Sequence, residues 1–416
     1  MPAHMSPRRA SSSGLRIVSV CRTLPTPADP TAGTFVAARL AALARVADAH
    51  VLQPVPFCPL VRPLPAWALA PAHTGGGLRI EPVPMFYLPA VMKGLDGLWL
   101  ARSIHGRVAA LNRREPIDAI DTHFGYPDGV GCVRVGRALG LPVFITIRGF
   151  ETDFLRRAGV GEQLRQALMT ATGCVSVSHS LRQLAIDYGV DPERIRVIPN
   201  AVDRALFHPG ERAAARQAIG LDPRAPLVVS VGHLVSGKRH HVLVRALAGL
   251  RRRYPNVQLT LIGGPAYEAD YPEALARLVR ELGLGEQVKM VGRLAQPLVN
   301  TWLQAADVFA LASHREGCCN AVLEALAAGR PVVAAPVGDN PQFIREGVNG
   351  LLAPVDDVAA FEHALSAALA RQWDGQAISR SLEVGDWNEV GRRVLEFFRE
   401  RLSAGSHGAA QGLAHG

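Results

Sequence analysis

The sequence of 416 residues lacks a hydrophobic run long enough to cross a membrane. A spanning helix needs about 18 to 20 predominantly apolar residues, and Arg, Gly or Pro interrupts every long apolar stretch. Residues 1–13 also lack the apolar segment and cleavage site of an export signal. We therefore expect a cytoplasmic protein in which residues 1–13 form a disordered lead-in.

Cysteine is scarce, and its spacing argues against a fold held by disulfides or by a structural zinc ion. The six cysteines form no Cys-x-x-Cys pair and no zinc-like arrangement with His. Neither a disulfide framework nor a structural zinc site is indicated, which agrees with a reducing, cytoplasmic location.

The sequence also lacks the features of a nucleic-acid-binding protein. The formal net charge is +9, and residues 1–205 hold 23 Lys and Arg against 15 Asp and Glu. A basic surface attracts nucleic acid, anionic lipid or a phosphorylated substrate, but no basic groove interleaved with aromatic residues and no helix-turn-helix pattern occurs. We therefore expect lipid or an acidic substrate and no nucleic acid, with functionless scattered arginines as the alternative.

Short apolar strands alternate with helical segments twice along the chain. The first series predicts strands at 15–20, 119–122, 142–147, 173–176 and 196–198, with helices at 35–47, 129–139 and 180–188. The second predicts strands at 227–231, 258–262, 288–290, 308–311 and 332–334, with helices at 238–252, 271–282, 301–305 and 320–328. Such alternation is typical of an α/β protein with parallel sheets.

These two series predict two Rossmann-like, doubly wound domains that face each other across a cleft. The predicted first domain is 14–205 and the second 206–380, followed by the segment 381–402, which contains an amphipathic helix, and a disordered tail at 403–416. Ligands in such sheets bind beyond the carboxyl ends of the strands, so loops of both domains are expected to line the cleft.

A glycine-rich loop follows the predicted strand 227–231 and reads VGHLVSGKRH. Amides at the start of a helix favour an anion, Gly232 permits close approach, and Lys238 adds a positive charge. A nucleotide-hydrolysing phosphate loop needs Ser or Thr after the Lys to hold Mg²⁺, but Arg239 stands there. The loop therefore indicates a metal-free diphosphate clamp with two cations rather than an ATPase site.

Two carboxylates, Glu316 and Glu324, flank the stretch GCCNAVL. Eight positions on a helix span roughly 12 Å at about 1.5 Å per residue, which suits the distance from a sugar across a diphosphate to a ribose. Glu324 would accept both ribose hydroxyls. The amides of Gly317, Cys318 and Cys319 would be free to bind an oxyanion or hydroxyl. Solvated surface charges are the alternative interpretation of the two glutamates.

With its continuation LEALAAGRPVVAAPVG, this stretch resembles the signature of the family 4 glycosyltransferases of the GT-B fold. The resemblance covers nearly all of residues 15–402. Supporting stretches are TAGTFVAARLAAL, HFGYPDGVGCVRVGRALGLPVFITIRG, VIPNAVDRALFHP, VGHLVSGKRHHVLVRAL and VKMVGRLAQPLVNTWLQAADVFALAS.

The resemblance implies a retaining transfer of a sugar from a nucleotide diphosphate donor, UDP- or GDP-linked, to an acceptor hydroxyl. It implies no cofactor, and since the Asp-x-Asp motif of the other major glycosyltransferase fold is absent, no metal is expected. The expected acceptor is a lipid-linked or cell-surface glycan, as in polysaccharide or cell-envelope biosynthesis. The basic segment MKGLDGLWLARSIHGRVAALNRR suggests peripheral contact with the inner face of an anionic membrane. A buried amphipathic helix is the equal alternative for this segment.

The resemblance also implies roles for single residues. Glu316 would hold hydroxyls of the donor sugar, Glu324 the ribose, and Lys238 the diphosphate. The remaining roles are: Gly33 at the donor phosphate, His123 at the sugar, Arg293 at the base, and Arg148 at the diphosphate or an acidic acceptor. As a lone histidine, His123 could equally be a buried core residue.

Four positions depart from the family pattern. His233 replaces a common Arg, Arg239 a Gly, Asp339 a Gly and Gln342 a Glu. The departures near His233 and Gln342 leave a non-catalytic subunit as one alternative. A nucleotide-sugar epimerase shares the architecture and is the other, although the spacing of Glu316 and Glu324 speaks against it.

Overall fold

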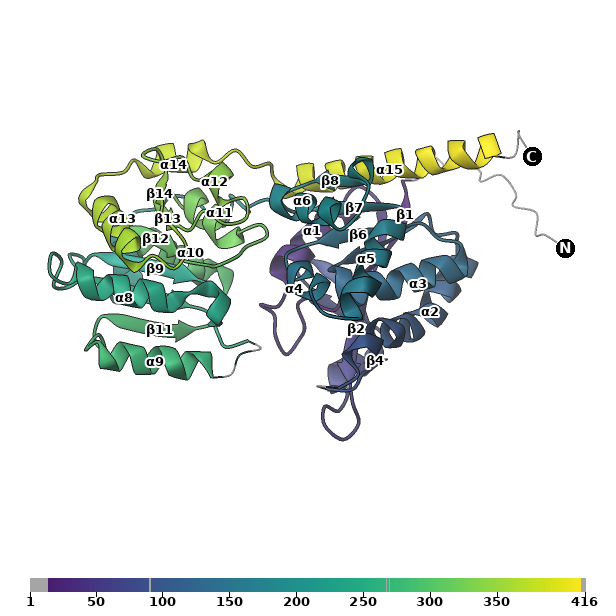
Figure 1. Cartoon of the computed structure of the whole chain (residues 1–416), viewed down its shortest axis with the longest axis horizontal. Coiled ribbons are helices and arrows are strands. Elements are labelled where there is room, and N and C mark those ends of the chain that lie inside the picture. Colours follow the sequence, from purple (N-terminus) through teal and green to yellow (C-terminus); the bar gives the residue numbers. More distant parts are fainter. Residues whose placement is uncertain (1–13, 90, 267, 269, 413–416) are drawn as a thin grey trace.

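The chain folds into two α/β domains side by side, joined by a short linker and by the last helix (Figure 1). The computed structural model describes residues 14–89, 91–266, 268 and 270–412. The expected lead-in at 1–13 therefore lies outside the described residues. Among the residues described, no helix combines the length and apolarity needed to traverse a bilayer.

The first domain is built on an eight-stranded sheet in the order β3-β4-β2-β1-β5-β6-β7-β8. The strands are β1 (Arg16–Val20), β2 (Asp48–Phe57), β3 (His73–Gly75), β4 (Leu78–Phe86), β5 (Ala119–His123), β6 (Val143–Ile147), β7 (Gly173–Ser176) and β8 (Ile195–Val197). All pairings are parallel except that of β3 with β4. This confirms the predicted doubly wound class.

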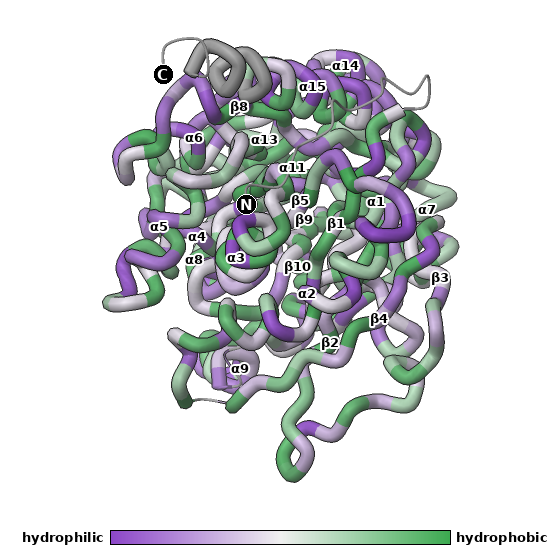
Figure 2. The backbone as a smooth tube through the Cα atoms, turned by 90° about the vertical axis from the view of Figure 1, so that its right-hand side faces the viewer, coloured by the Kyte–Doolittle hydropathy of each residue, from purple (hydrophilic) through white to green (hydrophobic). Residues whose placement is uncertain are grey.

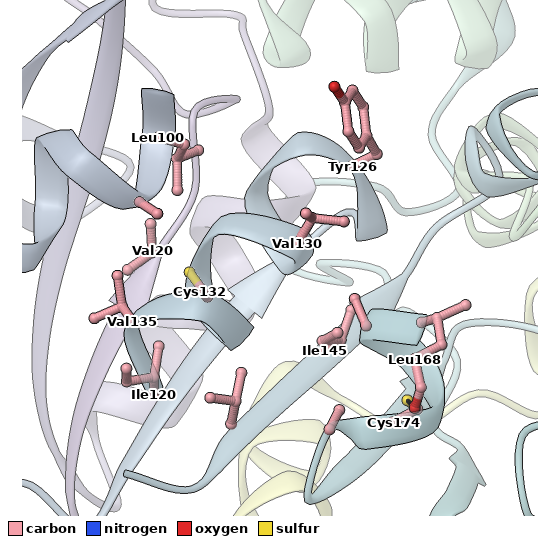
Figure 3. Close-up of a cluster of buried hydrophobic side chains, with 14 of the residues drawn as sticks. Val20, Leu100, Ile120, Tyr126, Val130, Cys132, Val135, Ile145, Leu168 and Cys174 are labelled. Atoms are coloured by element: carbon pink, nitrogen blue, oxygen red, sulfur yellow. Dashed lines mark hydrogen bonds between the residues drawn. The ribbon is translucent and has the colours of Figure 1, made fainter. Parts of the chain in front are cut away.

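Helices cover both faces of this sheet. They are α1 (Thr34–Ala44), α2 (Asp96–Arg114), α3 (Val130–Leu139), α4 (Glu151–Leu155), α5 (Val160–Thr170) and α6 (His179–Asp187). Apolar side chains of α2 and α3 pack on the strands, as Leu100, Val130 and Ile145 show in Figure 3. The apolar stripe of α2 is therefore buried in the core, as in the buried-helix interpretation of the basic segment.

The second domain has a parallel six-stranded sheet in the order β11-β10-β9-β12-β13-β14. Its strands are β9 (Leu227–Val231), β10 (Gln258–Ile262), β11 (Val288–Gly292), β12 (Val308–Leu311), β13 (Val332–Ala334) and β14 (Gly350–Leu352). Its helices are α7 (Arg212–Ala218), α8 (His240–Leu250), α9 (Tyr271–Glu281), α10 (Gln296–Ala305), α11 (Asn320–Ala327), α12 (Asn340–Phe343), α13 (Val358–Ala370) and α14 (Gly375–Ser381).

The last helix, α15 (Trp387–Gly412), returns to the first domain and lies along its upper edge in Figure 1. Phe397 and Phe398 are buried, and the ring of Phe398 stacks on Phe144 of β6 with centroids 3.9 Å apart. The prediction of a disordered tail from residue 403 was wrong for most of its length, because the helix continues to Gly412. Residues 413–416 lie outside the described part of the chain.

Two strands of the first sheet, β2 and β4, carry prolines that conceal them in the sequence. Pro54 and Pro56 lie in β2, yet β2 pairs with β1 only from Asp48 to Leu52. The prolines therefore fall beyond the end of β1, where the missing N–H groups leave no ladder bond unmade on that side. Beyond Leu52, β2 continues to pair with β4 as far as Phe57.

Replacing Phe398 with Ala should destabilise the first domain by about 3–5 kcal/mol, because it removes a fully buried aromatic ring from the α15 contact. Chemical denaturation followed by a first-domain fluorescence signal would measure the loss. Arg399→Ala, an exposed neighbour on the same helix, is the control and should change stability little. Equal effects of the two substitutions would contradict the docking of α15 through its aromatic face.

Candidate functional site

Both sheets have their switch point at the strands predicted to carry the site. In the second domain the order reverses between β9 and β12, and in the first between β1 and β5. Loops that leave neighbouring parallel strands on opposite sides open a crevice at such a point. Lys238 follows β9 and Glu316 follows β12, whereas Gly33 follows β1 and His123 ends β5.

Lys238 and Glu316 form an ion pair at the switch point of the second domain. Lys238 Nζ lies 2.6 Å from Glu316 Oε1, and the two side chains are 25% and 9% exposed. The lysine stem packs over Gly232, where an added Cβ would lie 3.5 Å from Lys238 Cδ and Cε. The structure thus brings three of the predicted residues together.

Arg239 points away from this pair. Its Nε lies 2.9 Å from Asp356 Oδ1, and its backbone is left-handed, with φ of 53°. A left-handed residue at this turn explains why the family pattern has Gly here, since Gly adopts that conformation without strain. In this structure the guanidinium is paired with Asp356 rather than with a group of the Lys238–Glu316 pair.

Glu268, which follows β10, contacts the glycine-rich loop, and the sequence analysis did not predict this contact. Its carboxylate accepts hydrogen bonds from the Ser236 amide at 2.8 Å and from the Ser236 hydroxyl at 3.1 Å. One of the backbone amides expected to face a diphosphate, that of Ser236, thus already donates its hydrogen bond to this carboxylate. Lys238 therefore remains the main cationic candidate on this loop.

The loop after β12 presses its glycine against the first domain. An added Cβ on Gly317 would lie 2.5 Å from the carbonyl oxygen of Arg148, so only Gly fits. Among the described residues, no hydrogen bond uses the amides of Gly317, Cys318 or Cys319 as donors, as the prediction of an anion-binding or hydroxyl-binding loop requires. Burial raises the pKa of the Cys318 thiol to about 12 and that of Cys319 well above its usual value, which suits packing rather than redox chemistry.

Glu324 lies on α11, a helix that packs into the hydrophobic core of the second domain. Its carboxyl has a pKa raised to about 8 because burial disfavours the charged form. None of the hydrogen bonds described here compensates for that burial. The residue is nevertheless partly accessible, and a desolvated carboxyl that can still be reached suits a site where ligand hydroxyls replace water.

His123 lies behind Arg148 and is fully buried. Its Nδ1 accepts hydrogen bonds from Arg148 Nε at 3.2 Å and Nη2 at 3.1 Å, so the proton is assigned to Nε2, 3.4 Å from Asp121 Oδ2. Burial, together with the cations Arg148 and Arg39, lowers the pKa of His123 to about 4 although Asp121 opposes the shift. The structure thus holds a neutral histidine with both ring nitrogens directed at protein groups.

Arg148 continues this network into the second domain. Its Nη1 donates to Asn200 Oδ1 at 3.1 Å, and Asn200 Nδ2 donates to Asn320 Oδ1 at 2.8 Å on the first turn of α11. Burial lowers the pKa of Arg148 to about 9, which still leaves the guanidinium charged at neutral pH. The main-chain carbonyl of Arg148 also lies against Gly317, so Arg148 stands where the first domain meets the Glu316 loop.

Gly33 and Arg293 both involve the loop between β1 and α1, and their predicted roles at the phosphate and the base stay predictions. Gly33 has φ of 57°, and an added Cβ would lie 2.2 Å from the Thr23 carbonyl oxygen; a larger residue would therefore displace the loop before α1. Arg293 Nη1 lies 2.8 Å from Asp29 Oδ2 of that same loop. This ion pair joins the loop before α1 of the first domain to the loop after β11 of the second.

Asp339, a departure from the family pattern, joins the domains on another side. Its carboxylate accepts hydrogen bonds from the amides of His179 at 2.8 Å and Ser180 at 3.3 Å. These are the first amides of α6, where a negative charge also complements the helix dipole. Next to it, an added Cβ on Gly338 would lie 2.8 Å from the Glu316 carbonyl oxygen. The contact between the domains is thus built directly against the predicted donor loop.

Only some of these contacts could be anticipated from the sequence. Asp339 was visible as a departure without a role, whereas Asn200 and Glu268 carried no signal, because each acts through a partner more than 30 positions away. The side chains of Gln342 and His233 take part in none of the hydrogen bonds described above, and nothing in the structure explains these two departures.

Two facing doubly wound domains, with a lysine–carboxylate pair at the switch point of one of them, define a GT-B architecture. Two family models match adjoining parts of the chain: one described as Glycosyltransferase Family 4 at residues 65–206, and one described as Glycosyl transferases group 1 at residues 211–380. The chain belongs to the family 4 glycosyltransferases of the GT-B fold.

Curated relatives agree with this assignment. The chain is 34% identical over 249 residues to a D-inositol 3-phosphate glycosyltransferase of Nocardia farcinica, covering 58% of this chain and 55% of the relative. It is 41% identical over 179 residues to a protein of the same name from Mycolicibacterium gilvum, covering 43% and 40%. The matches thus span about half the length of these relatives.

Solved structures show the same fold. Anabaena Alr3699/HepE in complex with UDP superposes with a TM-score of 0.72 at 18% identity, covering 93% of this chain and 100% of that one. Sucrose-phosphate synthase from Thermosynechococcus elongatus gives a TM-score of 0.69 at 20% identity, covering 96% and 100%. At these identities the likeness concerns the fold alone.

Glu324→Gln should make the stability of the second domain less dependent on pH. The folded-state pKa of about 8 exceeds the ordinary value of 4.5, so the folded protein holds a proton that the unfolded chain releases. Wild-type stability should therefore fall as pH rises from about 4.5 to 8, whereas the variant should not show this loss. Denaturation at acidic, neutral and alkaline pH would test it, with the exposed Glu281→Gln as control. If the stability of the variant relative to the wild type does not increase with pH, the raised pKa of Glu324 is refuted.

Asp339→Ala should loosen the contact between the domains. The substitution leaves two amides of α6 without their acceptor, at a cost of about 1 kcal/mol for such a cap. Small-angle scattering should show a larger radius of gyration. Asp357→Ala removes a cap of α13 within the second domain and should leave the radius unchanged. An unchanged radius for Asp339→Ala would show that other contacts alone hold the domains.

Proposed function

We propose that the protein transfers a sugar from a nucleotide diphosphate donor to an acceptor hydroxyl, with retention of the anomeric configuration. One observation carries this proposal: the Lys238–Glu316 pair lies at the switch point of the second sheet, on a loop that touches Arg148 of the first domain. Membership of the family and the likeness to a fold found with UDP support the donor class.

The Lys238–Glu316 ion pair would be exchanged when the donor binds. In the structure the ammonium of Lys238 is held by Glu316 at 2.6 Å. A diphosphate arriving at the start of α8 would compete for that ammonium because it carries more negative charge. Glu316 would then be released to accept hydrogen bonds from sugar hydroxyls. Lys238 would stabilise the charge that develops on the departing diphosphate.

The other predicted residues complete the donor site. Glu324 would accept the ribose hydroxyls, which would replace the hydration that burial removes. The amides of Gly317, Cys318 and Cys319 would bind oxygen atoms of the donor. Arg148 would add the charge of the first domain, held in place by neutral His123. As the family resemblance implies, we propose attack on the same face as the departing group, assisted by the leaving phosphate.

The acceptor is proposed to dock on the first domain. From the sequence we expect a lipid-linked or cell-surface glycan, used at the inner face of a membrane. Relatives named for D-inositol 3-phosphate offer a second acceptor class, a phosphorylated polyol. Both classes carry negative charge or lie near it, in keeping with the basic excess of residues 1–205.

Lys238→Ala should lower turnover about 10²–10³-fold, the usual cost of removing one group that stabilises developing charge. Glu316→Gln should lower turnover while retaining thermal stabilisation by UDP or GDP, because it contacts the sugar rather than the diphosphate. Release of nucleotide from a panel of UDP- and GDP-sugars, with and without acceptors, would measure both, and product NMR would give the anomeric configuration.

Lys289→Ala, an exposed lysine of β11, is the matched control and should behave as wild type. Donor interconversion without any acceptor would favour the epimerase. Full cellular function in Glu316→Gln would favour the non-catalytic subunit. Either result would overturn the proposed transfer.

A further inference from the structure

The first domain exposes a group of large apolar side chains that the core does not use. Leu60 is 96% exposed and Val61 71% exposed, in the loop that leaves β2. Val91 and Met92, just before α2, are 56% and 59% exposed. In Figures 1 and 2 the loop after β2 extends beyond the lower edge of the domain. Isolated exposed apolar residues are common, but a group of them indicates a contact surface.

These two segments belong to one surface because aromatic rings connect their bases. Phe57, at the end of β2, packs edge-on against Phe86 with ring centroids 6.2 Å apart. Phe86 in turn packs against Trp99 of α2 with centroids 5.2 Å apart. The neighbouring ring of Tyr87 lies beneath both loops: Lys93 stands 4.7 Å from its centroid and Arg62 6.0 Å. We call Leu60, Val61, Val91 and Met92 the apolar tip.

Cations surround the apolar tip. Arg62 follows it directly, Lys93 follows Met92, and the Arg102 guanidinium lies 5.6 Å from the ring centroid of Trp99. Behind them, α2 and α3 enclose a shallow groove of about 270 Å³ that is lined by Arg102, His105 and Arg134. Within the part of the chain that the structure describes, only Lys93 among these cations has an ion-pair partner, Asp96 at 3.5 Å. The surface is therefore apolar at its tip and positive around it.

We infer that the apolar tip and its cations seat the first domain on an anionic lipid bilayer. Apolar side chains that enter the headgroup region and basic side chains that meet anionic lipid are the two contributions that hold a protein at a membrane surface. The inference rests on the proposed function, whose lipid-linked acceptor would lie at such a surface. It assigns the contact to the loops rather than to α2, whose apolar side is buried.

A second copy of this chain fits the surface less well. A symmetric contact would bring the cations of one tip against the same cations of the other. The tip holds four large apolar side chains, whereas a stable interface buries about 800 Å² on each partner. An anionic bilayer satisfies the charge and needs no matching shape.

The inference is tested by co-sedimentation of the full chain with vesicles of phosphatidylcholine alone or with about 30 mol% phosphatidylglycerol. The wild type should bind the anionic vesicles and not the neutral ones, and added salt should weaken binding. The double variant Leu60→Ser, Val61→Ser should bind at least tenfold more weakly. Val348→Ser, which removes a 53% exposed apolar side chain of the second domain, is the matched control and should bind as wild type.

Donor hydrolysis in solution, without vesicles, separates this inference from the proposed function. The tip variant should hydrolyse donor as the wild type does. Vesicle binding that depends on the tip supports the inference even where no donor is hydrolysed. Hydrolysis without vesicle binding overturns it, as does equal weakening by Val348→Ser. A dimer in solution that the tip variant dissociates would also overturn it, in favour of a second copy.

Discussion

The site depends on one constraint, the adjacency of β9 and β12 in a parallel sheet. Because the carboxyl ends of parallel strands meet at one edge, the loops after these strands converge although 78 positions separate Lys238 from Glu316. The switch in strand order at this pair sends the loops to opposite sides and leaves room between them. An ion pair of low exposure forms there because the lysine stem lies over a glycine and the carboxylate has little water around it.

The first domain meets this pair through a short series of buried polar groups. Asp121, His123, Arg148, Asn200 and Asn320 connect β5 to the start of α11. A charged histidine would place a third cation beside Arg148 and Arg39, and the pKa of about 4 excludes that at neutral pH. The neutral ring instead accepts from Arg148 and fixes its orientation. The polar series ends at Asn320, just after the loop that carries Glu316, and Gly338 beside Asp339 approaches the Glu316 carbonyl oxygen. Both contacts between the domains therefore lie next to the proposed donor loop.

The proposed donor site and the proposed membrane contact occupy different parts of the molecule. The proposed donor site lies mainly on the second domain, with Arg148 added from the first, whereas the apolar tip belongs to the loops around β2 and α2 of the first domain. The basic excess of residues 1–205 lies in the same domain as the proposed membrane contact, while the remainder of the chain is nearly neutral. Lys238 is paired with Glu316, and Arg148 donates to His123 and Asn200, whereas Arg62 and Arg102 have no ion-pair partner among the described residues.

The sequence by itself determined the two-domain α/β class, because short apolar strands alternating with helices leave few other folds. Strands β7, β9, β10, β12 and β13 were predicted with the bounds that the structure shows. The strand β2 was missed because Pro54 and Pro56 lack the N–H groups that a central strand needs. Only the structure shows that β1 ends before it reaches these two prolines. The tail beyond residue 402 was misjudged because its polar composition hides a helix already begun at Trp387. Local pattern predicted which residues would bind a diphosphate. Only the tertiary structure decided that Arg239 faces Asp356, that His123 supports Arg148, and that Asp339 joins the domains, because each contact joins residues that are distant in sequence and that only the packed sheets and domains bring together.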